Sequence, residues 1–590
     1  MTSTGPVTDT EGPTQERARG ILEETVGVVN AVRDRLDPRS VAARVDPVGF
    51  GSALAGAVRS AVSHPRTSAR IGLGWGLDTV RASGVSAVRA VGGTAKGPAV
   101  LPESDRAYAD PVWEENAWYW LCRQQSALFC ARLRELAGAV ELDPVAQRKI
   151  DFLVAQIVEA AAPANWPVSS PAMVQSAFRT GGRSLARGLR NAVRDITQNG
   201  GMPRQFVPGA YAVGETLAAT PGTVVFRNRL VELIQYAPQT PTVHEIPLLM
   251  SPPWINKYYI MDLAPQRSLV ERAVQDGHTV FMISYRDPDE SLRELTMSDY
   301  LREGLLAALD AVQEITGAPK VNVAGLCLGG TMAAAALAWL AARGDERVNS
   351  LTLMNTLLDF SRPGLLGVFT DEATVDRLER VMRKDGYLPA ASMKRTFDLL
   401  RATDLVWGYA GSGWLQGQDP APFDMLTWNG DSTRMPAEMQ TEYLRTCYLA
   451  NELAEGKLEL AGERLELGAI TQDSYVITAE RDHIAPWDSV YIGARLLGGN
   501  VRFVLSNSGH IAGVVNPPSA KSRHWFADSS ELPERAQDWR DDAVERRASW
   551  WEDWTPWIAE HAGEMRTPPA TGSAAHPRLV EAPGTYVLRG

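Results

Sequence analysis

The chain has 590 residues, of which 45% are apolar and 22% are charged, and its formal net charge is −11. These values exclude collagen-like, coiled-coil and wholly disordered proteins, and the acidic balance excludes a general nucleic-acid binder, which carries a basic footprint. The length exceeds what one compact core usually organises, so we expect two or more structural units.

The N-terminus and the cysteines bear on where the protein works. The first twenty residues contain no apolar run of the kind found in secretory signals. No apolar run in the chain reaches the roughly 20 residues of a membrane helix. The four cysteines, Cys122, Cys130, Cys327 and Cys447, fit neither a disulfide framework nor a C-x-x-C metal site. We therefore expect a reduced, cytoplasmic protein without a transmembrane segment.

Helical signals dominate the first 205 residues. Residues 1–15 are expected to be disordered, and residues 16–205 are expected to form a helical N-terminal domain. The arginines from Arg179 to Arg194 are expected to form a solvated helix face, with attraction of phosphate groups as the alternative. Three stretches carry the firmest helical pattern, the last of them weakened by two central glycines: Trp113–Leu136, Val145–Ala162 and Met173–Gln198.

From residue 206 onward, short β-rich runs alternate with helical ones. This alternation predicts βαβ units and a mostly parallel sheet, so we expect a catalytic domain over residues 206–575. The alternation is lost over residues 359–465, which we expect to be a cap or lid inserted over the C-terminal edge of the sheet. Residues 576–590 are expected to be a loose tail. The predicted strands are Thr223–Phe226, Leu230–Tyr236, Ile246–Met250, Thr279–Ser284, Val321–Ala324, Ser350–Met354, Ser474–Thr478 and Val501–Leu505.

The sequence Gly325-Leu326-Cys327-Leu328-Gly329 lies between a predicted strand and an Ala-rich helix. It matches the G-x-S-x-G nucleophile elbow with sulfur in place of oxygen. The glycines avoid collisions in a sharp turn, and the helix N-terminus favours a thiolate. The structural alternative is a small buried cysteine in a βα turn. Composition gives roughly 0.03 chance matches to the motif. We therefore predict an α/β-hydrolase fold with Cys327 as its nucleophile.

Two later loops supply the partners of this nucleophile. In the predicted fold an acid and then a histidine follow the nucleophile along the chain. Asp482 follows the strand Ser474–Thr478 and His510 follows the strand Val501–Leu505, so both lie at strand C-termini, where α/β sheets place their sites. We predict that His510 is the base and that Asp482 fixes its tautomer. His483, which adjoins Asp482, is the competing histidine.

An oxyanion hole in this fold takes one N–H from the residue after the nucleophile, here Leu328. We expect the second N–H from the loop after Ile246–Met250, at Trp254 or Ile255. A structural loop with a Pro-Pro turn is the alternative interpretation of that segment.

Several motifs resemble those of the polyhydroxyalkanoate synthases, in particular the long single-subunit type. They are GLCLGG, PPWINKYYIMDL, FDMLTWNGDSTRMP, DHIAPW, SGHIAGVVNPP and WWEDWTPW, and the resemblance covers most of residues 100–590. It implies an α/β-hydrolase fold in which the family's nucleophile, aspartate and histidine fall on Cys327, Asp482 and His510. The first hundred residues match poorly.

The resemblance also implies a function: an acyltransferase that polymerises 3-hydroxyacyl-CoA into polyester, releasing CoA through an acyl-Cys intermediate. CoA is then part of the substrate, so we expect no cofactor and no metal. The implied partners are the substrate, the growing polyester chain, the granule surface and a second copy in a homodimer. Two other functions stay open. One is a thioesterase or depolymerase that uses the same triad, and the other is a non-catalytic granule-associated protein.

Overall fold

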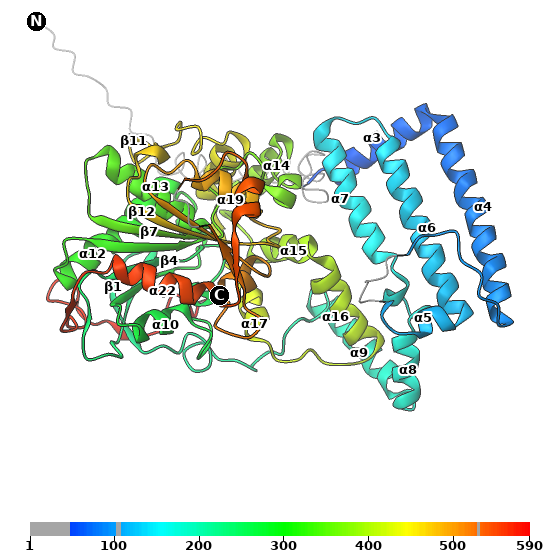
Figure 1. Ribbon diagram of the computed structural model, residues 1–590, viewed down its shortest axis with the longest axis horizontal. Helices are drawn as coiled ribbons and strands as arrows, with labels where there is room; N and C mark the ends of the chain where they lie inside the picture. The colour runs from blue at the N-terminus through cyan, green and yellow to red at the C-terminus, as the bar shows by residue number, and fades with distance from the viewer. Residues whose placement is uncertain (1–47, 102–107, 528–530, 590) are drawn as a thin grey trace, which may run out of the picture.

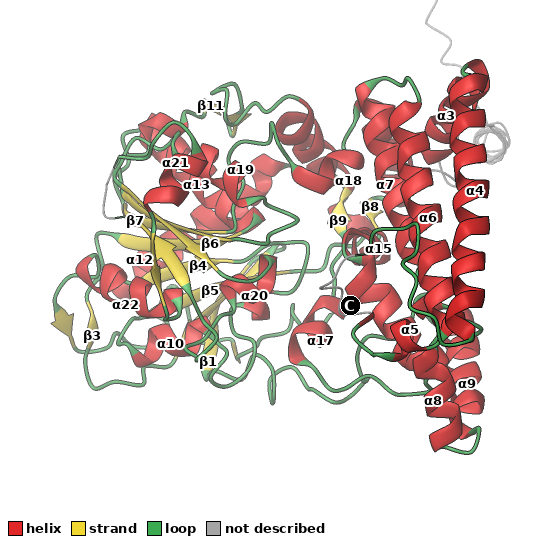
Figure 2. Ribbon diagram, turned by 45° about the vertical axis from the view of Figure 1, so that its right-hand side comes forward, coloured by secondary structure: helices red, strands yellow, loops and turns green. Residues whose placement is uncertain are grey.

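The computed structural model describes residues 48–101, 108–527 and 531–589. Figures 1 and 2 show a bundle of long helices at one end, an α/β body at the other, and further helices between them. The disorder expected for residues 1–15 lies outside the described residues. Within the described ranges, no helix combines the length and the apolar character needed to cross a membrane.

The N-terminal part of the described chain is helical throughout. The long helices α4 and α6 lie side by side, and α7 begins where the Asp143 carboxylate accepts hydrogen bonds from the N–H groups of Val145 and Ala146. The predicted helix Met173–Gln198 is two helices, because Gly181 and Gly182 take positive φ angles of 56° and 81° between them. The helices are α3 (Phe50–Ser63), α4 (Pro65–Ala90), α5 (Val112–Glu115), α6 (Ala117–Ala139), α7 (Pro144–Ala160), α8 (Pro171–Arg179) and α9 (Arg183–Gln198).

One sheet organises the second half of the chain, with strand order β15-β14-β13-β12-β7-β6-β4-β5-β2-β1-β17. The central strands from β13 to β5 run parallel, and the strands outside them pair antiparallel. Every strand predicted from the sequence is present, so the predicted α/β sheet after a helical region is confirmed. The strands are β1 (Gly222–Arg227), β2 (Val231–Tyr236), β4 (Leu248–Ser251), β5 (Val280–Tyr285), β6 (Val321–Leu326), β7 (Val348–Met354), β12 (Asp473–Ala479), β13 (Val501–Ser506), β14 (His524–Phe526), β15 (Val544–Arg546) and β17 (Val580–Glu581).

Alternate residues of the central strands face two separate cores, as the twofold period of a strand requires. In β5, Phe281 and Ile283 join one core while Val280 and Met282 join the other. Both faces of the parallel strands are therefore covered, which explains why these strands are apolar without alternation. The first core is covered by α12 (Ala307–Thr316), α13 (Leu328–Ala342), α19 (Trp487–Ala494) and α21 (Ala536–Asp542), and the second by α10 (Leu269–Gln275) and α22 (Trp550–Glu560).

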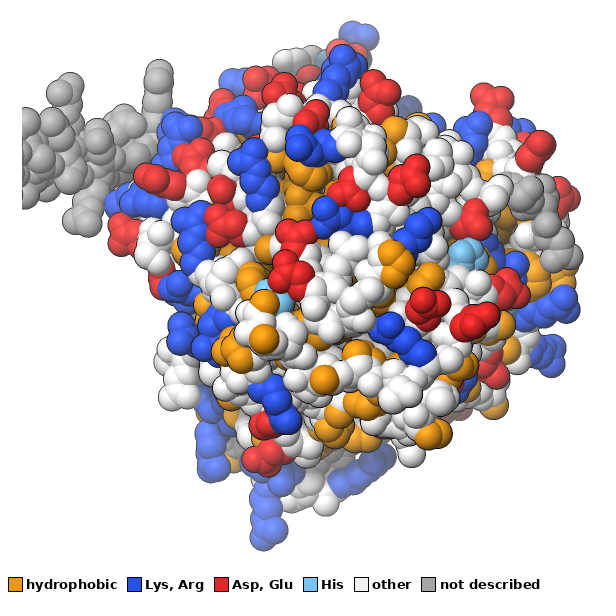
Figure 3. All heavy atoms as spheres, turned by 90° about the vertical axis from the view of Figure 1, so that its left-hand side faces the viewer, with side chains coloured by type: hydrophobic (Ala, Val, Ile, Leu, Met, Phe, Trp, Pro, Cys, Tyr) orange, Lys and Arg blue, Asp and Glu red, His pale blue; other side chains and the backbone are white. Residues whose placement is uncertain are grey.

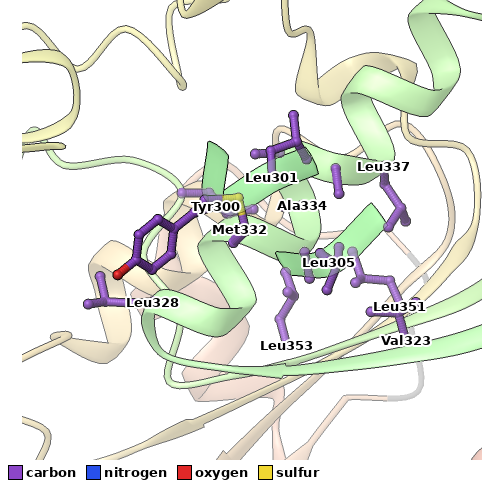
Figure 4. Close-up of a cluster of buried hydrophobic side chains, with 14 of the residues drawn as sticks. Tyr300, Leu301, Leu305, Val323, Leu328, Met332, Ala334, Leu337, Leu351 and Leu353 are labelled. Carbon is purple, nitrogen blue, oxygen red and sulfur yellow. The ribbon is translucent and has the colours of Figure 1, made fainter. Parts of the chain in front are cut away.

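Helix α13 lies in the first core and is apolar on all sides, as a helix surrounded by protein should be. Figure 4 shows Met332 and Leu337 of this helix among buried side chains that include Leu351 and Leu353 of β7. Its many alanines let the helix approach the sheet closely. The start of α13 is thereby held at a fixed height above the C-terminal end of β6.

Residues 359–465, expected as a cap or lid, fold mainly into short helices between the sheet and the N-terminal bundle (Figure 2). Several of them are π-helical, and two small strand pairs, β8 (Tyr387–Leu388) with β9 (Met435–Pro436) and β10 (Glu459–Leu460) with β11 (Glu463–Arg464), connect them. The helices are α14 (Glu372–Asp385), α15 (Ala390–Leu400), η7 (Thr403–Trp407), α16 (Gly408–Ala410), η8 (Gly411–Leu415), α17 (Asp424–Gly430), α18 (Ala437–Tyr443) and η9 (Leu444–Leu449).

The helical bundle is docked on this insertion by a buried ion pair. Lys149 of α7 lies 2.6 Å from the carboxylate of Asp371, which caps α14, and also donates to the Thr374 hydroxyl. Burial alone would raise the pKa of Asp371, but hydrogen bonds from Lys149 and Thr374 hold it below its usual range. Beside this pair, Phe152 of α7 packs on Phe50 and Phe369, with ring centroids 5.9 Å and 5.4 Å away.

The expectation of a loose tail at residues 576–590 is wrong. Val580–Glu581 pairs with β1 at the edge of the sheet, and the side chains of Tyr586 and Val587 are buried. The reason is the carboxylate of Glu232, which is fully buried on β2 and accepts hydrogen bonds from the backbone N–H groups of Thr585 and Tyr586. A buried carboxylate needs such donors, and the C-terminal segment supplies them.

Replacing Lys149 by Met should destabilise the docking of the bundle, because it leaves the Asp371 carboxylate buried without its cation. Breaking a buried pair in this way costs about 3–5 kcal/mol. We expect a lower thermal unfolding midpoint and faster proteolytic release of the bundle.

The double variant Lys149→Met/Asp371→Leu should recover most of the loss. As a control, Lys457→Met removes an exposed partner of Glu455 and should have little effect. A double variant no better than the single one would rule out the pair as the cause.

Candidate active site

Cys327 lies between β6 and α13, where the chain makes its sharp strand-to-helix turn. Its φ of 51° and ψ of −120° are values that residues with a side chain rarely adopt, at a cost of about 1–3 kcal/mol. Its N–H donates to the Met354 carbonyl on the neighbouring strand β7, 2.8 Å away. The thiol therefore stands at the N-terminal end of α13, above the C-terminal edge of the sheet.

Glycines allow the backbone to come this close to itself. A Cβ on Gly325 would lie 2.4 Å from the Cα of Gly330, and a Cβ on Gly329 would lie 2.1 Å from the Ser251 carbonyl oxygen. The sequence predicted the need for glycine at 325 and 329. The structure adds Gly330, whose Cβ would lie 2.0 Å from the Thr356 hydroxyl. The end of β4 at Ser251 and the segment after β7 at Thr356 therefore both lie directly against the turn.

The predicted histidine and aspartate meet at this turn. His510 begins the short helix α20 (His510–Val514) after β13, and its Nδ1 donates to the Asp482 carboxylate at 2.6 Å. The other oxygen of Asp482 accepts hydrogen bonds from the backbone N–H groups of Ile484 and Ala485. His510 and Cys327 also line one cavity. Because Nδ1 is held by Asp482, Nε2 is the ring nitrogen left to face the thiol.

The pKa of His510 follows from these neighbours. Burial by itself lowers the pKa of an imidazole, but the Asp482 charge and hydrogen bond, together with the neighbouring Cys327 side chain, raise it to about 10. The ring thus binds a proton strongly in the folded protein. Such a ring is suited to hold the proton that the neighbouring thiol gives up when it becomes a nucleophile.

The competing histidine, His483, lies nearby but lacks these contacts. Burial, followed by the positive charge of His510, lowers its pKa to about 4, so it is neutral near pH 7. Both histidines line a cavity together with Cys327, but the ring bonded to the Asp482 carboxylate is that of His510. The geometry favours His510 as the base.

The remaining cysteines have no such environment. Burial raises the pKa of Cys447 to about 12, and burial also raises the pKa values of Cys130 and Cys122. A thiol with a raised pKa holds little thiolate and is a poor nucleophile. Among the four cysteines, Cys327 has the environment of a nucleophile.

The expected oxyanion hole is brought together in part. Leu328, the first residue of α13, lies on the cavity wall beside Cys327, and so does Ile255. The side chain of Trp254 points away into the core, where its ring packs edge-on against Tyr300 at 5.4 Å. The structure therefore puts the side chain of Ile255, rather than that of Trp254, at the cavity. The role of either N–H group stays a prediction.

Two chambers meet at Cys327, and both include Ile255 in their walls. The first has a volume of about 520 Å³ and is called the apolar chamber here, because aliphatic and aromatic side chains of the insertion form most of its wall. Val48 and Phe50, at the start of the helical bundle, close part of it. The apolar chamber includes Leu357, Leu366, Phe369, Leu378, Val381, Leu388, Met393, Leu399, Tyr443, Leu444 and Tyr448.

The second chamber, about 500 Å³, lies on the His510 side and is called the mixed chamber. Its wall combines aromatic side chains with charged and polar ones. Some of these residues lie within the motifs quoted above, but they come from separated segments, and only the fold shows that they form one wall. The mixed chamber includes Asn256, Arg267, Arg401, Asp404, Tyr409, Phe423, Trp428, Asn429 and His483.

Comparison with known proteins gives consistent matches. Residues 104–273 match the family model described as "Poly-beta-hydroxybutyrate polymerase (PhaC) N-terminus", and residues 256–517 match "alpha/beta hydrolase fold". The chain is 43% identical over 500 residues to "Poly(3-hydroxyalkanoate) polymerase subunit PhaC" of Cupriavidus necator, covering 83% of this chain and 84% of that protein. It is 38% identical to "Poly(3-hydroxyalkanoate) polymerase" of Methylorubrum extorquens, with 92% and 93% covered. The predicted α/β-hydrolase fold is thereby confirmed.

Substitution of Gly329 by Ala should disrupt the turn, because the added methyl group would meet the backbone of Ser251 and Pro252. Overpacking against rigid backbone costs about 1–3 kcal/mol or more. We expect a thermal midpoint lower by several degrees and slower alkylation of Cys327 by iodoacetamide. The matched control is Gly76→Ala in α4, where no atom lies within 4 Å and alanine favours the helix by up to about 1 kcal/mol. Unchanged stability and alkylation in Gly329→Ala would contradict this account of the turn.

Proposed function

The chain belongs to the poly(3-hydroxyalkanoate) polymerases, which are acyltransferases, and on that premise we propose that Cys327 carries the growing acyl group. The observation that supports this most directly is that the Cys327 thiol shares a cavity with His510, whose Nδ1 is held by Asp482. Covalent acyl transfer requires a nucleophile, a base within reach of it and a group that orients the base.

In the first half-reaction, Nε2 of His510 accepts the Cys327 proton and the sulfur attacks the thioester carbonyl of 3-hydroxyacyl-CoA. The negative charge that develops on the carbonyl oxygen is placed near the N-terminus of α13, where the Leu328 N–H and the loop containing Ile255 are positioned to donate. The carbon–sulfur bond to CoA then breaks, and the leaving thiolate takes the proton from His510. The acyl group remains on Cys327.

In the second half-reaction, the 3-hydroxyl of one unit attacks a cysteine-bound acyl carbonyl. His510 accepts the hydroxyl proton as the new ester bond forms, and returns it to the departing Cys327 sulfur. Asp482 keeps the ring in the tautomer whose Nε2 faces the thiol. Water competing at this step would release a free acid, so the site must exclude it. The insertion that walls both chambers is suited to that task.

The two chambers differ in what they suit. The apolar chamber fits an aliphatic acyl chain, because burial of its methylene groups is favourable there. The mixed chamber presents Arg267 and Arg401, each also paired with a carboxylate, and polar groups suited to the CoA portion. We place the thioester between them, with its carbonyl at Cys327.

We also propose that the protein works in the cytoplasm as a homodimer at the surface of the granules it makes. The support for granule association is chemical: the product is a water-insoluble polyester that stays attached to Cys327 during growth. The support for a dimer is the family resemblance of the sequence.

Incubation with 3-hydroxybutyryl-CoA should release CoA and yield insoluble polymer, and Cys327→Ala should lose at least about 10³-fold of that rate. Butyryl-CoA, which lacks the 3-hydroxyl, should acylate Cys327 once and stop, as mass spectrometry of the Cys327 peptide would show. Free 3-hydroxybutyrate as the main product would instead indicate a thioesterase. Polymer formed by Cys327→Ala would eliminate the covalent route.

The two histidines can be separated by the rate at which iodoacetamide alkylates Cys327 near pH 7. Without a base to take its proton, a thiol reacts slowly with alkylating reagents at this pH, so His510→Gln should slow alkylation at least tenfold. His483→Gln is the matched control and should change the rate by less than threefold, because His510, and not His483, is bonded to Asp482. The reverse order would make His483 the base.

A further inference from the structure

Helix α9 buries its polar side and exposes its apolar side. Ser184, Gly188, Asn191 and Asp195 form the buried face, which packs on η8 of the insertion. A surface helix of a globular protein normally has the opposite arrangement. The exposed row, at helical spacing, is Leu185 (40% exposed), Leu189 (67%), Val193 (53%) and Ile196 (61%).

Specific contacts fix this orientation. The carbonyl oxygen of Trp414 lies so close that a Cβ on Gly188 would be 2.1 Å from it. Asn191 donates to the Gly413 carbonyl at 3.2 Å, and Asp195 accepts a hydrogen bond from the Trp414 indole at 2.9 Å. The helix cannot turn its leucines inward without breaking all of these contacts. The exposure of the apolar row is therefore part of the fold.

The neighbouring helix also exposes large apolar side chains. On α8, Phe178 is 85% exposed and Val174 lies one turn before it. Figures 1 and 2 show α8 and α9 together at the end of the helical bundle, away from the sheet. The apolar surface, as the term is used below, is the row Leu185, Leu189, Val193 and Ile196 of α9.

A row of arginines runs beside the apolar surface. At roughly 100° per residue, Arg183, Arg187, Arg190 and Arg194 fall on the arc of α9 between its exposed apolar face and its buried face. The acidic residue of α9, Asp195, is turned inward. Among the described residues, Arg183, Arg187 and Arg190 form no ion pair within 4.0 Å. By contrast, acidic and basic side chains are interspersed over the face of the molecule that Figure 3 shows. The formal net charge of the whole chain is −11.

We propose that the apolar surface and its arginine row dock the protein on an anionic phospholipid surface. An aliphatic row beside a cationic row is the arrangement of interfacial helices, in which the apolar side chains enter the headgroup boundary and the guanidinium groups bind phosphates. A sixteen-residue helix is about 24 Å long, so all of its rows can engage one plane at once. A second copy fits less well, because α9 has no exposed acidic side chain that could pair with the arginines of its copy.

The test is flotation of the full-length protein with vesicles of phosphatidylglycerol and phosphatidylcholine, against vesicles of phosphatidylcholine alone. The wild-type protein should float with the anionic vesicles and at least tenfold less with the neutral ones. Salt at 0.5 M should weaken the binding, because it screens the arginines. Failure to bind anionic vesicles would overturn the proposal.

Two multiple-substitution variants test whether α9 is the vesicle-binding site. Leu185→Gln/Leu189→Gln/Val193→Thr/Ile196→Gln and, separately, Arg183→Gln/Arg187→Gln/Arg190→Gln should each lower vesicle binding at least tenfold, with unchanged thermal stability and CoA release. The matched control is Leu73→Gln/Leu77→Gln/Val80→Gln, which alters equally exposed aliphatic residues of α4 and should bind as the wild type does. Equal loss in the control would overturn the assignment to α9. A dimer that dissociates in the first variant, without a change in vesicle binding, would identify a second copy as the partner.

Discussion

The strained turn at Cys327 is the constraint on which the rest of the structure depends. A residue with a side chain is held at a φ of 51° because the N–H of Cys327 is bound to Met354 and three glycines let the adjoining backbone close around it. Backbone strain of this kind persists only where the surrounding structure is rigid. The parallel sheet beneath and the fully buried helix α13 provide that setting.

Buried carboxylates join segments that lie far apart along the chain. Asp482 holds His510, and Asp371 holds Lys149 of the helical bundle. Glu232 holds the C-terminal segment through Thr585 and Tyr586. Each of these groups is costly to bury alone, and donors from a distant segment add to its local partners. The site, the bundle and the C-terminus are therefore parts of one cooperative structure.

The helical bundle contributes to the site as well as to the surface. Phe50 closes part of the apolar chamber, and the bundle braces the insertion through Lys149 and Phe152. The bundle thus contributes to the cavity through packing contacts. Its helix α9 exposes a row of apolar side chains. One part of the chain therefore forms both a wall of the apolar chamber beside Cys327 and an outward-facing apolar row.

The sequence by itself determined the strands and the turn at Cys327, and it placed Asp482 and His510 at the ends of later strands, because each of these features depends on a short local pattern of period, glycine spacing or strand end. Only the tertiary structure decided that Ile255 faces the cavity, that Phe50 lines it, that Val580–Glu581 joins the sheet, and that α9 turns its polar side inward. These features depend on contacts between distant segments. A local pattern states which side of an element is apolar, but the partner that covers it is set by how the whole chain packs.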